Sequence, residues 1–396
     1  MELLSPAGSY RKCEYAFEYG ADACYAGIPD FSLRVKENKF TKTDIKKGID
    51  LAHKLNKKFY ITLNIYAHNQ HIAKLEKYVD EIKKLDPDAL IISDPGIIRL
   101  IKKNWPKAKI HLSTQANCTN WQAAKFWYEQ GLERVILGRE VTLKEIVEIK
   151  KKVPKLELEV FVQGAMCWSY SGRCILSKAL TDRSANLGDC SQCCRWNYAL
   201  MEEKRPGEYL PIEEDQHGTY ILSSKDMCLI EHLDKLEKAG IDSLKIEGRN
   251  KTIFYLAHII KAYRKVLDKD WTKKRGLEEV QKVATRKLHT GFLLGKQAEE
   301  DPKHRRGKAE FKFVGEVIKF NKKEGITEVK VHNEIYKGEE IEFIGPDDEF
   351  KLKLNQIINA ETGKELDSVH GGSQHVIHIK LDKNINNKYL IRKKII

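Results

Sequence analysis

The sequence lacks the long apolar segments that place a chain in or across a membrane. No stretch approaches about 18 consecutive apolar residues, which argues against a transmembrane helix. The first residues, MELLSPAGSYRK, carry the carboxylate of Glu2 and no apolar core, so they do not resemble a secretory signal peptide. We therefore expect a cytoplasmic protein with no membrane partner, whose cysteine thiols stay reduced.

Three sequence motifs of common enzyme classes are also absent. The chain contains neither the G-x-S-x-G nucleophile elbow nor the H-E-x-x-H helix of zinc proteases. Its first predicted turn, LLSPAGS, does not match the glycine-rich turn of doubly wound nucleotide-binding folds. These absences disfavour hydrolases of those two types and a dinucleotide-binding sheet. A cysteine nucleophile with a histidine partner remains open, because that pair depends on distances in space.

The composition is that of a globular protein with excess positive charge. The 396 residues are 41% hydrophobic, enough for one large core and a smaller second one. Seventy Lys and Arg against 57 Asp and Glu give a net charge of +13, which favours a polyanionic partner such as RNA. Many lysines lie in helical patterns such as residues 41–58, where a solvated helix face explains them equally well.

Eight short apolar segments alternate with amphipathic segments over the first three-quarters of the chain. The amphipathic segments, such as residues 74–86 and 142–153, carry apolar side chains near helical spacing. This alternation predicts an α/β fold, a (β/α)8 TIM-like barrel over residues 1–295 with a cysteine-rich insertion at about 164–220. An open doubly wound sheet is the alternative. The predicted strands are residues 1–8, 21–27, 57–65, 88–94, 109–114, 134–139, 156–164 and 243–249.

The pattern changes after about Gly291. Residues 296–308 are polar and charged and are predicted to form a linker. Residues 309–396 contain six short segments of alternating polarity separated by turn residues, which predict a small all-β barrel domain. Small β domains of this kind often bind nucleic acid or protein, which is an analogy at the level of the fold.

Polar side chains gather at the carboxyl ends of the predicted strands, where barrels of this class hold their active sites. Arginine suits anionic substrates, because its guanidinium group matches carboxylate and phosphate. Ion pairs with the neighbouring Glu140 or Glu247 are the alternative explanation for the arginines. We predict catalytic roles for His68, Gln115, Asn117 and Glu247. We predict substrate-binding roles for Arg34, Arg139, Gln163 and Arg249.

Four cysteines with the spacing C-x6-C-x15-C-x3-C indicate a metal or cluster site. They are Cys167, Cys174, Cys190 and Cys194, and Cys193 adjoins the last one. Thiols gathered this closely in a reducing compartment usually hold a metal or a cluster. An iron–sulfur cluster is preferred, because such clusters tolerate irregular spacing, whereas structural zinc favours compact pairs. Zinc is second, and disulfides are third because the total of nine cysteines is odd.

Several segments resemble the peptidase U32 family. The run from Glu159 to Ser177, EVFVQGAMCWSYSGRCILS, is similar to the family signature. The opening residues, FSLR at 31–34, STQANCTNW at 113–121 and SLKIEGR at 243–249 resemble other blocks of it. The resemblance covers nearly the whole chain. Within the family, the chain most resembles bacterial members that hydroxylate tRNA. The segment GDCSQCCRW at 188–196 resembles the second cysteine pair of those members.

The resemblance implies a hydroxylase that works without molecular oxygen. Family members carry a 4Fe-4S cluster on four cysteines, which correspond here to Cys167, Cys174, Cys190 and Cys194. For the tRNA branch, the resemblance implies wobble uridine as the substrate, 5-hydroxyuridine as the product and prephenate as the oxygen source. Arg139 and Arg249 are then expected to bind the two carboxylates of prephenate. Trp168 and Tyr170 are expected to stack on RNA bases.

Other functions remain open on the sequence. A collagenase-like U32 peptidase predicts a nucleophile whose loss stops peptide cleavage whatever the metal content. A hydroxylase of ribosomal RNA or of a quinone precursor fits the same cluster, although the basic charge favours RNA. A non-catalytic RNA-binding protein predicts salt-sensitive binding without a change in nucleoside composition. Cys193 or Cys228 is an alternative cluster ligand, and the sequence indicates no oligomeric state.

Overall fold

The computed structural model describes residues 1–28, 31–32, 40–165, 169, 173–187, 189–195, 214–215, 218–219, 225–249, 251–295, 310–371, 375–385 and 388–395. Among the helices in these ranges, none combines the length and apolarity that crossing a bilayer requires. The predicted linker at 296–308 lies outside the described residues, so its boundaries stay a prediction.

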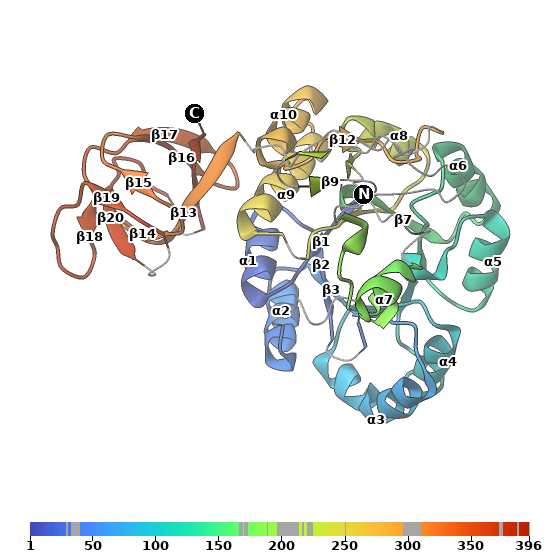
Figure 1. The fold of residues 1–396 in the computed structure, drawn as a ribbon. Helices are drawn as coiled ribbons and strands as arrows, with labels where there is room; N and C mark the ends of the chain where they lie inside the picture. The colour runs from blue at the N-terminus through green and yellow to red at the C-terminus, as the bar shows by residue number, and fades with distance from the viewer. Residues whose placement is uncertain are drawn as a thin grey trace.

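Eight parallel strands close into a barrel, as the sequence predicts (Figure 1). Each strand pairs with its neighbour in chain order, and β11 closes the ring by pairing with both β7 and β1. All eight predicted strand segments contain one of these strands, so the predicted (β/α)8 fold is confirmed. The barrel strands are β1 (Glu2–Pro6), β2 (Ala23–Gly27), β3 (Lys58–Leu63), β4 (Ala89–Ile92), β5 (Ile110–Leu112), β6 (Arg134–Ile136), β7 (Glu157–Ala165) and β11 (Ser243–Ile246).

The helices around the barrel begin at capping residues. Thr142 and Glu145 form a capping box at the start of α6, in which Glu145 Oε2 accepts from Thr142 N at 2.7 Å. Asp94 accepts from Ile97 N at 2.9 Å, ahead of Pro95 at the first position of α4. The helices are α1 (Tyr10–Glu18), α2 (Lys42–Lys54), α3 (Asn69–Leu85), α4 (Pro95–Asn104), α5 (Trp121–Glu129), α6 (Leu143–Lys152), α7 (Leu176–Thr181), α8 (Leu233–Lys238), α9 (Ile253–Leu267) and α10 (Lys273–Val283).

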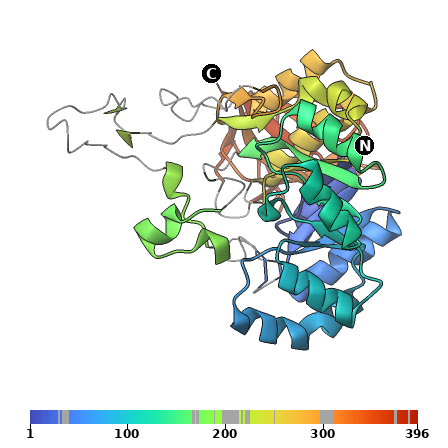
Figure 2. The ribbon, with the colours of Figure 1, turned by 90° about the vertical axis from the view of Figure 1, so that its right-hand side faces the viewer.

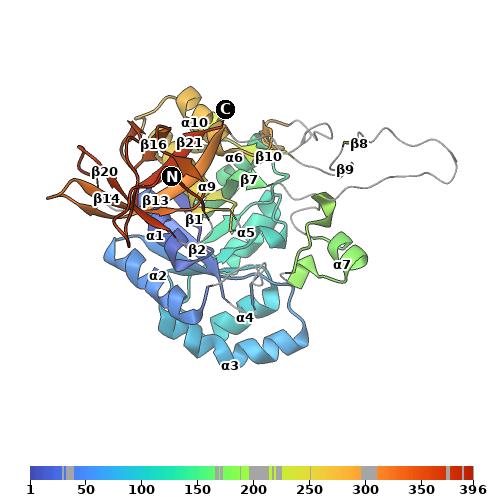
Figure 3. The same cartoon turned by 60° about the vertical axis from the view of Figure 1, so that its left-hand side comes forward.

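The regular alternation of strand and helix is interrupted after β7. Strand β10 (Asp226–Cys228) runs antiparallel to the end of β7, with Cys228 opposite Gln163. Strand β12 (Leu288–His289) then pairs with β10. Figures 2 and 3 show α7, from the cysteine-rich segment, set apart from the helices that surround the barrel. The described part of this segment also holds the short pair β8 (Glu214–Asp215) and β9 (Gly218–Thr219).

The predicted small all-β unit is confirmed as a half-barrel with its own hydrophobic core. Its seven antiparallel strands follow the order β17-β16-β21-β13-β14-β20-β18, and β15 pairs with β19 beside them. The strands are β13 (Phe311–Asn321), β14 (Ile326–Val331), β15 (Ile335–Tyr336), β16 (Glu340–Ile344), β17 (Glu349–Lys353), β18 (Ile358–Asn359), β19 (Ser368–Val369), β20 (Val376–Lys380) and β21 (Leu390–Lys394).

Buried polar contacts attach this unit to the barrel helices. Lys261 Nζ on α9 donates to the carbonyl oxygen of Gly345 at 2.8 Å. Arg392 on β21 reaches α10, where its Nη1 lies 2.9 Å from Glu279 Oε1. Because α9 begins shortly after Arg249, the attachment supports the helix that follows a predicted site residue.

Candidate active site at the barrel mouth

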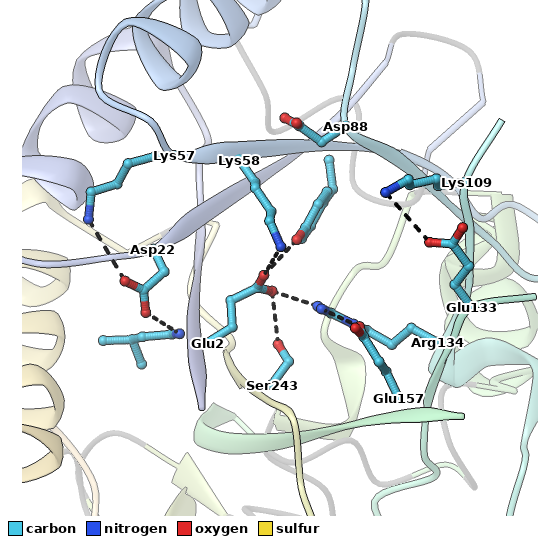
Figure 4. Close-up of polar contacts among 12 residues, drawn as sticks. Glu2, Asp22, Lys57, Lys58, Asp88, Lys109, Glu133, Arg134, Glu157 and Ser243 are labelled. Carbon is cyan, nitrogen blue, oxygen red and sulfur yellow. Dashed lines mark hydrogen bonds and ion pairs between the residues drawn. The ribbon is translucent and has the colours of Figure 1, made fainter. Parts of the chain in front are cut away.

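The amino-terminal end of the barrel is filled by mutually satisfied polar side chains (Figure 4). Glu2 Oε1 accepts from Arg134 Nη1 at 2.5 Å and from Ser243 Oγ at 3.2 Å. Tyr60 donates its hydroxyl to Glu2 Oε2 at 2.7 Å. Burial opposes ionisation of Glu2, but Arg134, Tyr60 and Lys58 together outweigh burial and lower the pKa of Glu2. Since catalysis in this fold takes place at the opposite end, we assign these contacts to stability.

A second charged group lies deep in the barrel on β7 and β11. Glu159 is fully buried, and its two oxygens accept from Lys245 Nζ at 2.8 Å and from Arg134 Nη1 at 3.1 Å. Burial lowers the pKa of Lys245, while the charge of Glu159 opposes that shift. Lys245 Nζ lies 4.3 Å from the ring centroid of Tyr25 and 5.6 Å from that of Phe161. These two rings also contact the arginines of the mouth.

Arg139 and Glu247 form an ion pair at the carboxyl ends of β6 and β11. Arg139 Nη2 lies 3.3 Å from Glu247 Oε2, and the two side chains are 8% and 11% exposed. The Arg139 guanidinium lies over the Phe161 ring, 4.1 Å from its centroid. A side chain at Gly164, where φ is +109°, would collide with the carbonyl oxygen of Glu247. Glycine therefore permits the close approach of β7 to Glu247 at the end of β11.

Arg249 is held by hydroxyl groups and an aromatic ring. It donates from Nη1 to Ser32 Oγ and from Nη2 to Thr62 Oγ1, both at 3.2 Å. Its guanidinium carbon lies 5.0 Å from the Tyr25 ring centroid. A side chain at Gly27 would collide with Ser32 Oγ, so β2 must end in glycine for this arrangement to form. The Arg249 side chain is therefore fixed before any substrate arrives.

Gln115 and Asn117 bring two unsatisfied acceptors to the end of β5. Both follow Ser113, which caps the 3-10 turn Thr114–Ala116. Asn117 has a left-handed backbone with φ of +53°, a conformation that asparagine tolerates. Gln115 Oε1 and Asn117 Oδ1 are buried without a hydrogen-bond partner among the described residues. Buried acceptors of this kind are uncommon in folded proteins, so these two mark a place where a ligand can donate.

Two predicted site residues lie elsewhere. Gln163 is buried and bonded to α9, donating from Nε2 to the Tyr255 hydroxyl at 3.2 Å and accepting from the Tyr263 hydroxyl at 3.1 Å. The pairing of β7 with β11 shifts its register after Lys245, so that Gln163 lies opposite Ile246. Ile246 directly follows Lys245, whose side chain points into the barrel. His68 is exposed at the start of α3, and its ring contacts that of His71. Arg34, Cys167, Trp168 and Tyr170 lie outside the described residues.

Sequence reasoning did not identify the residues beneath the arginines. Glu159 and Phe161 alternate along β7, and Lys245 precedes Glu247 by two residues on the last strand. The sequence did contain a signal for these residues, namely charged residues at alternate positions of otherwise apolar strands. Alternate positions lie on the same face of a strand. The barrel interior is where these faces meet.

The described cysteines of the cysteine-rich segment lie in a part of the chain fastened by serines. Ser177 Oγ and Ser191 Oγ are 2.9 Å apart, and Ser191 N donates to Ser177 Oγ at 3.0 Å. This joins the segment that carries Cys174 to the one that carries Cys190. Within the described residues, no three His, Cys, Asp or Glu side chains are grouped closely enough to hold a metal ion. The four-thiol ligand set stays a prediction, since its first member lies outside the described part.

Comparisons with known proteins match the chain along its whole length. Residues 8–303 match the description of peptidase family U32, and residues 309–392 match the peptidase family U32 C-terminal domain. The chain is 37% identical over 442 residues to the tRNA hydroxylation protein P of Haemophilus influenzae, which covers 99% of this chain and 96% of that protein. It is 38% identical over 441 residues to the Escherichia coli protein of the same name, with 99% and 96% covered.

The chain is also similar to a protein named for ribosomal RNA. It is 36% identical over 268 residues to the 23S rRNA 5-hydroxycytidine C2501 synthase of Escherichia coli. That alignment covers 68% of this chain and 39% of the Escherichia coli protein.

Proposed function

The chain belongs to peptidase family U32, and on this basis we propose that it hydroxylates a base of RNA. The observation that carries the proposal is the similarity, over nearly the full length of both chains, to proteins named for tRNA hydroxylation. The ribosomal RNA relative is matched over a smaller share of its length, which favours tRNA as the substrate. The net charge of +13 suits either RNA. With tRNA as substrate, the protein acts in the cytoplasm.

At a finer level, we propose that the target is the wobble uridine, that the product is 5-hydroxyuridine and that prephenate donates the oxygen. Prephenate carries two carboxylates, and Arg139 and Arg249 are two buried guanidinium groups at strand ends of the mouth. Each guanidinium lies against an aromatic ring, and Arg249 is also held by two hydroxyls. Side chains that are already ordered lose little further freedom when they bind an anion.

The unsatisfied amide oxygens of Gln115 and Asn117 suit the donors of such substrates. A uracil ring has one N–H donor, and prephenate has a hydroxyl group. In an anticodon loop the target base is already single-stranded, so little energy is needed to present it to the mouth. Glu247 orients the Arg139 side chain through their ion pair.

The donor set of the cysteine-rich segment suits the proposed 4Fe-4S cluster. Cysteine thiols are the ordinary ligands of such clusters, and Cys174, Cys190 and Cys194 lie in the part joined by Ser177 and Ser191. Cys167 is the fourth proposed ligand. When bound, the cluster would supply the redox or Lewis-acid chemistry that oxygen transfer without molecular oxygen requires. Zinc remains the alternative metal.

A peptidase is the alternative that the family name suggests. Burial raises the pKa of Cys118 to about 12 and that of Cys228 to about 11, so both thiols are protonated at neutral pH. Cys13 and Cys24 are fully buried. None of these four described thiols is a suitable nucleophile, which makes proteolysis the weaker proposal.

The test is an anaerobic assay with unmodified tRNA and prephenate, followed by mass spectrometry of the nucleosides. We expect about four iron and four sulfide per chain and a uridine derivative heavier by one oxygen atom. Omission of prephenate should abolish the product. A protein that contains zinc or no metal and leaves tRNA unchanged, yet cleaves peptides, would overturn the proposal.

A variant pair tests the role of the mouth. Arg249→Lys keeps the charge but removes the planar fork, and it should raise the KM for prephenate at least tenfold, which is about 1.4 kcal/mol. Arg99→Lys makes the same change on an exposed residue of α4 and should leave KM unchanged. Equal KM values in the two variants, at equal melting temperatures, would exclude Arg249 from substrate binding.

A further inference from the structure

A cavity of about 400 Å³ lies outside the barrel wall, between β10, β12 and the end of α10. The side chains described above for the barrel mouth do not line this cavity. Its lining includes Cys228, Glu231, Gln281, Arg286, Lys287 and His289. The cavity therefore brings one arginine and one lysine next to a single carboxylate.

The cavity flanks the barrel mouth. Asp226 on β10 lies opposite Ala165, the last residue of β7, and on its other side it pairs with Leu288 of β12. Asp226 N also donates to the carbonyl oxygen of Lys287 at 3.0 Å. Two strand spacings, about 10 Å, thus separate Leu288 from the mouth end of β7. A strand of RNA whose target base enters the mouth can reach this edge.

The part of the chain that carries α9, α10 and β12 is rich in positive charge. Residues 251–295 contain eleven Lys and Arg against four Asp and Glu. Residues 310–396, the appended β unit, contain fifteen of each and are neutral. The excess charge of the chain therefore lies outside the β unit. Polyanion binding is favoured on the barrel side, although small β domains often serve that purpose in other proteins.

A metal site is the other chemistry that the lining offers, and the geometry disfavours it. Cys228, Glu231 and His289 have side chains that bind metals, yet no group of three such residues is close enough among the described residues. The Cys228 thiol contacts the Tyr263 hydroxyl at 3.8 Å, and burial keeps it protonated at neutral pH. Arg286 and Lys287 are the cationic side chains of the lining.

We propose that this cavity binds a phosphodiester group of the RNA substrate through Arg286 and Lys287. The inference rests on the proposed function, because it assumes that an RNA strand approaches the mouth. A guanidinium fork can hold two phosphate oxygens, and an ammonium adds a second charge. Leu277 and Leu288 supply an apolar wall for the adjoining ribose. The contact anchors the strand beside the target base and carries no base specificity.

The experiment measures tRNA binding by fluorescence anisotropy over a series of salt concentrations. We expect the double variant Arg286→Gln/Lys287→Gln to bind more weakly, with the slope of log affinity against log salt reduced by about 1. The matched control, Lys322→Gln/Lys323→Gln, removes two exposed lysines between β13 and β14 and should bind as the wild type does. Equal melting temperatures establish that both variants are folded. In the nucleoside assay, the cavity variant should raise the KM for tRNA and leave kcat unchanged.

The outcomes separate this inference from the proposed function. Unchanged affinity and salt slope in the cavity variant would overturn the inference even if the wild type hydroxylates tRNA. If inorganic phosphate binds to the wild type but not to the cavity variant, while tRNA binds equally to both, the cavity is a free-anion site and the inference fails. If tRNA binding depends on Arg286 and Lys287 but no nucleoside changes, the cavity contact stands and the proposed function fails.

Discussion

Arg392 and Glu279 form an ion pair across the junction between the β unit and the barrel, with side chains 2% and 3% exposed and an Nη1–Oε1 distance of 2.9 Å. Arg392 also donates from Nε to Glu342 Oε2 at 2.8 Å within the β unit. One guanidinium thus connects β16, β21 and α10. Because α10 leads into the cavity at Arg286, the β unit supports a part of the barrel that we assign to substrate binding.

Removal of this arginine should destabilise the protein strongly. Arg392→Met removes the buried cation that pairs with Glu279 and Glu342, and we expect a loss of about 3–5 kcal/mol in the free energy of unfolding. Arg275→Met is the control, because Arg275 is 54% exposed and lies 3.7 Å from Glu349. Its loss should be below about 1 kcal/mol. Denaturant unfolding measures both, and equal losses would contradict a special role for the buried pair.

The same junction should give acid sensitivity. Burial opposes ionisation of Glu279, but His258, Arg392 and Lys282 together lower its pKa to about 2. Burial lowers the pKa of His258 to about 3, so Arg392 and Lys282 are the charged partners of Glu279 at neutral pH. A lowered carboxyl pKa contributes stability above the unfolded value near 4.5, and that contribution disappears as the pH falls towards 2.

Glu279→Gln should therefore lower the melting temperature at pH 7 and have a smaller effect near pH 3. The measurement is the melting temperature of both proteins across this range. A difference that stays constant from pH 7 to pH 3 would show that ionisation of Glu279 does not contribute to stability.

The charges inside the barrel should be strongly coupled. Lys245→Met removes one of the two cations that contact Glu159, and we expect it to cost about 3 kcal/mol. Glu159→Gln in the same chain should recover part of that loss, because the remaining amide needs no counter-charge. A double-mutant cycle measures the coupling, which should exceed about 1 kcal/mol. Additive effects would mean that the two side chains act independently.

The cysteine variants should separate cluster ligands from other thiols. Cys174→Ala and Cys190→Ala should each lose most of the iron after anaerobic purification, whereas Cys228→Ala should retain it. Cys193→Ala and Cys194→Ala distinguish the two candidates for the last ligand, and we expect iron loss in the second. Cys193 is buried, whereas Cys194 is half-buried. Iron content independent of all these positions would refute the ligand assignment.

The sequence alone was sufficient to predict the barrel and the β unit, but not the added strands β10 and β12. Eight apolar segments predicted all eight barrel strands, and the alternating pattern after Gly291 predicted the β unit. Both patterns are local, since burial of one strand face depends on the spacing of apolar residues along the chain. The family resemblance also came from contiguous segments of residues. Predictions of this kind do not require distances in space.

The arrangement of the mouth was decided by the tertiary structure. Arg139 pairs with Glu247, which lies 108 residues further along the chain. Gln163 hydrogen-bonds to tyrosines of α9. The register shift after Lys245 is the reason, because it changes the face of β7 on which the Gln163 side chain lies. The cavity at Arg286 exists because β12 pairs with β10. These contacts follow from barrel closure and strand register, which bring together side chains that no local pattern relates.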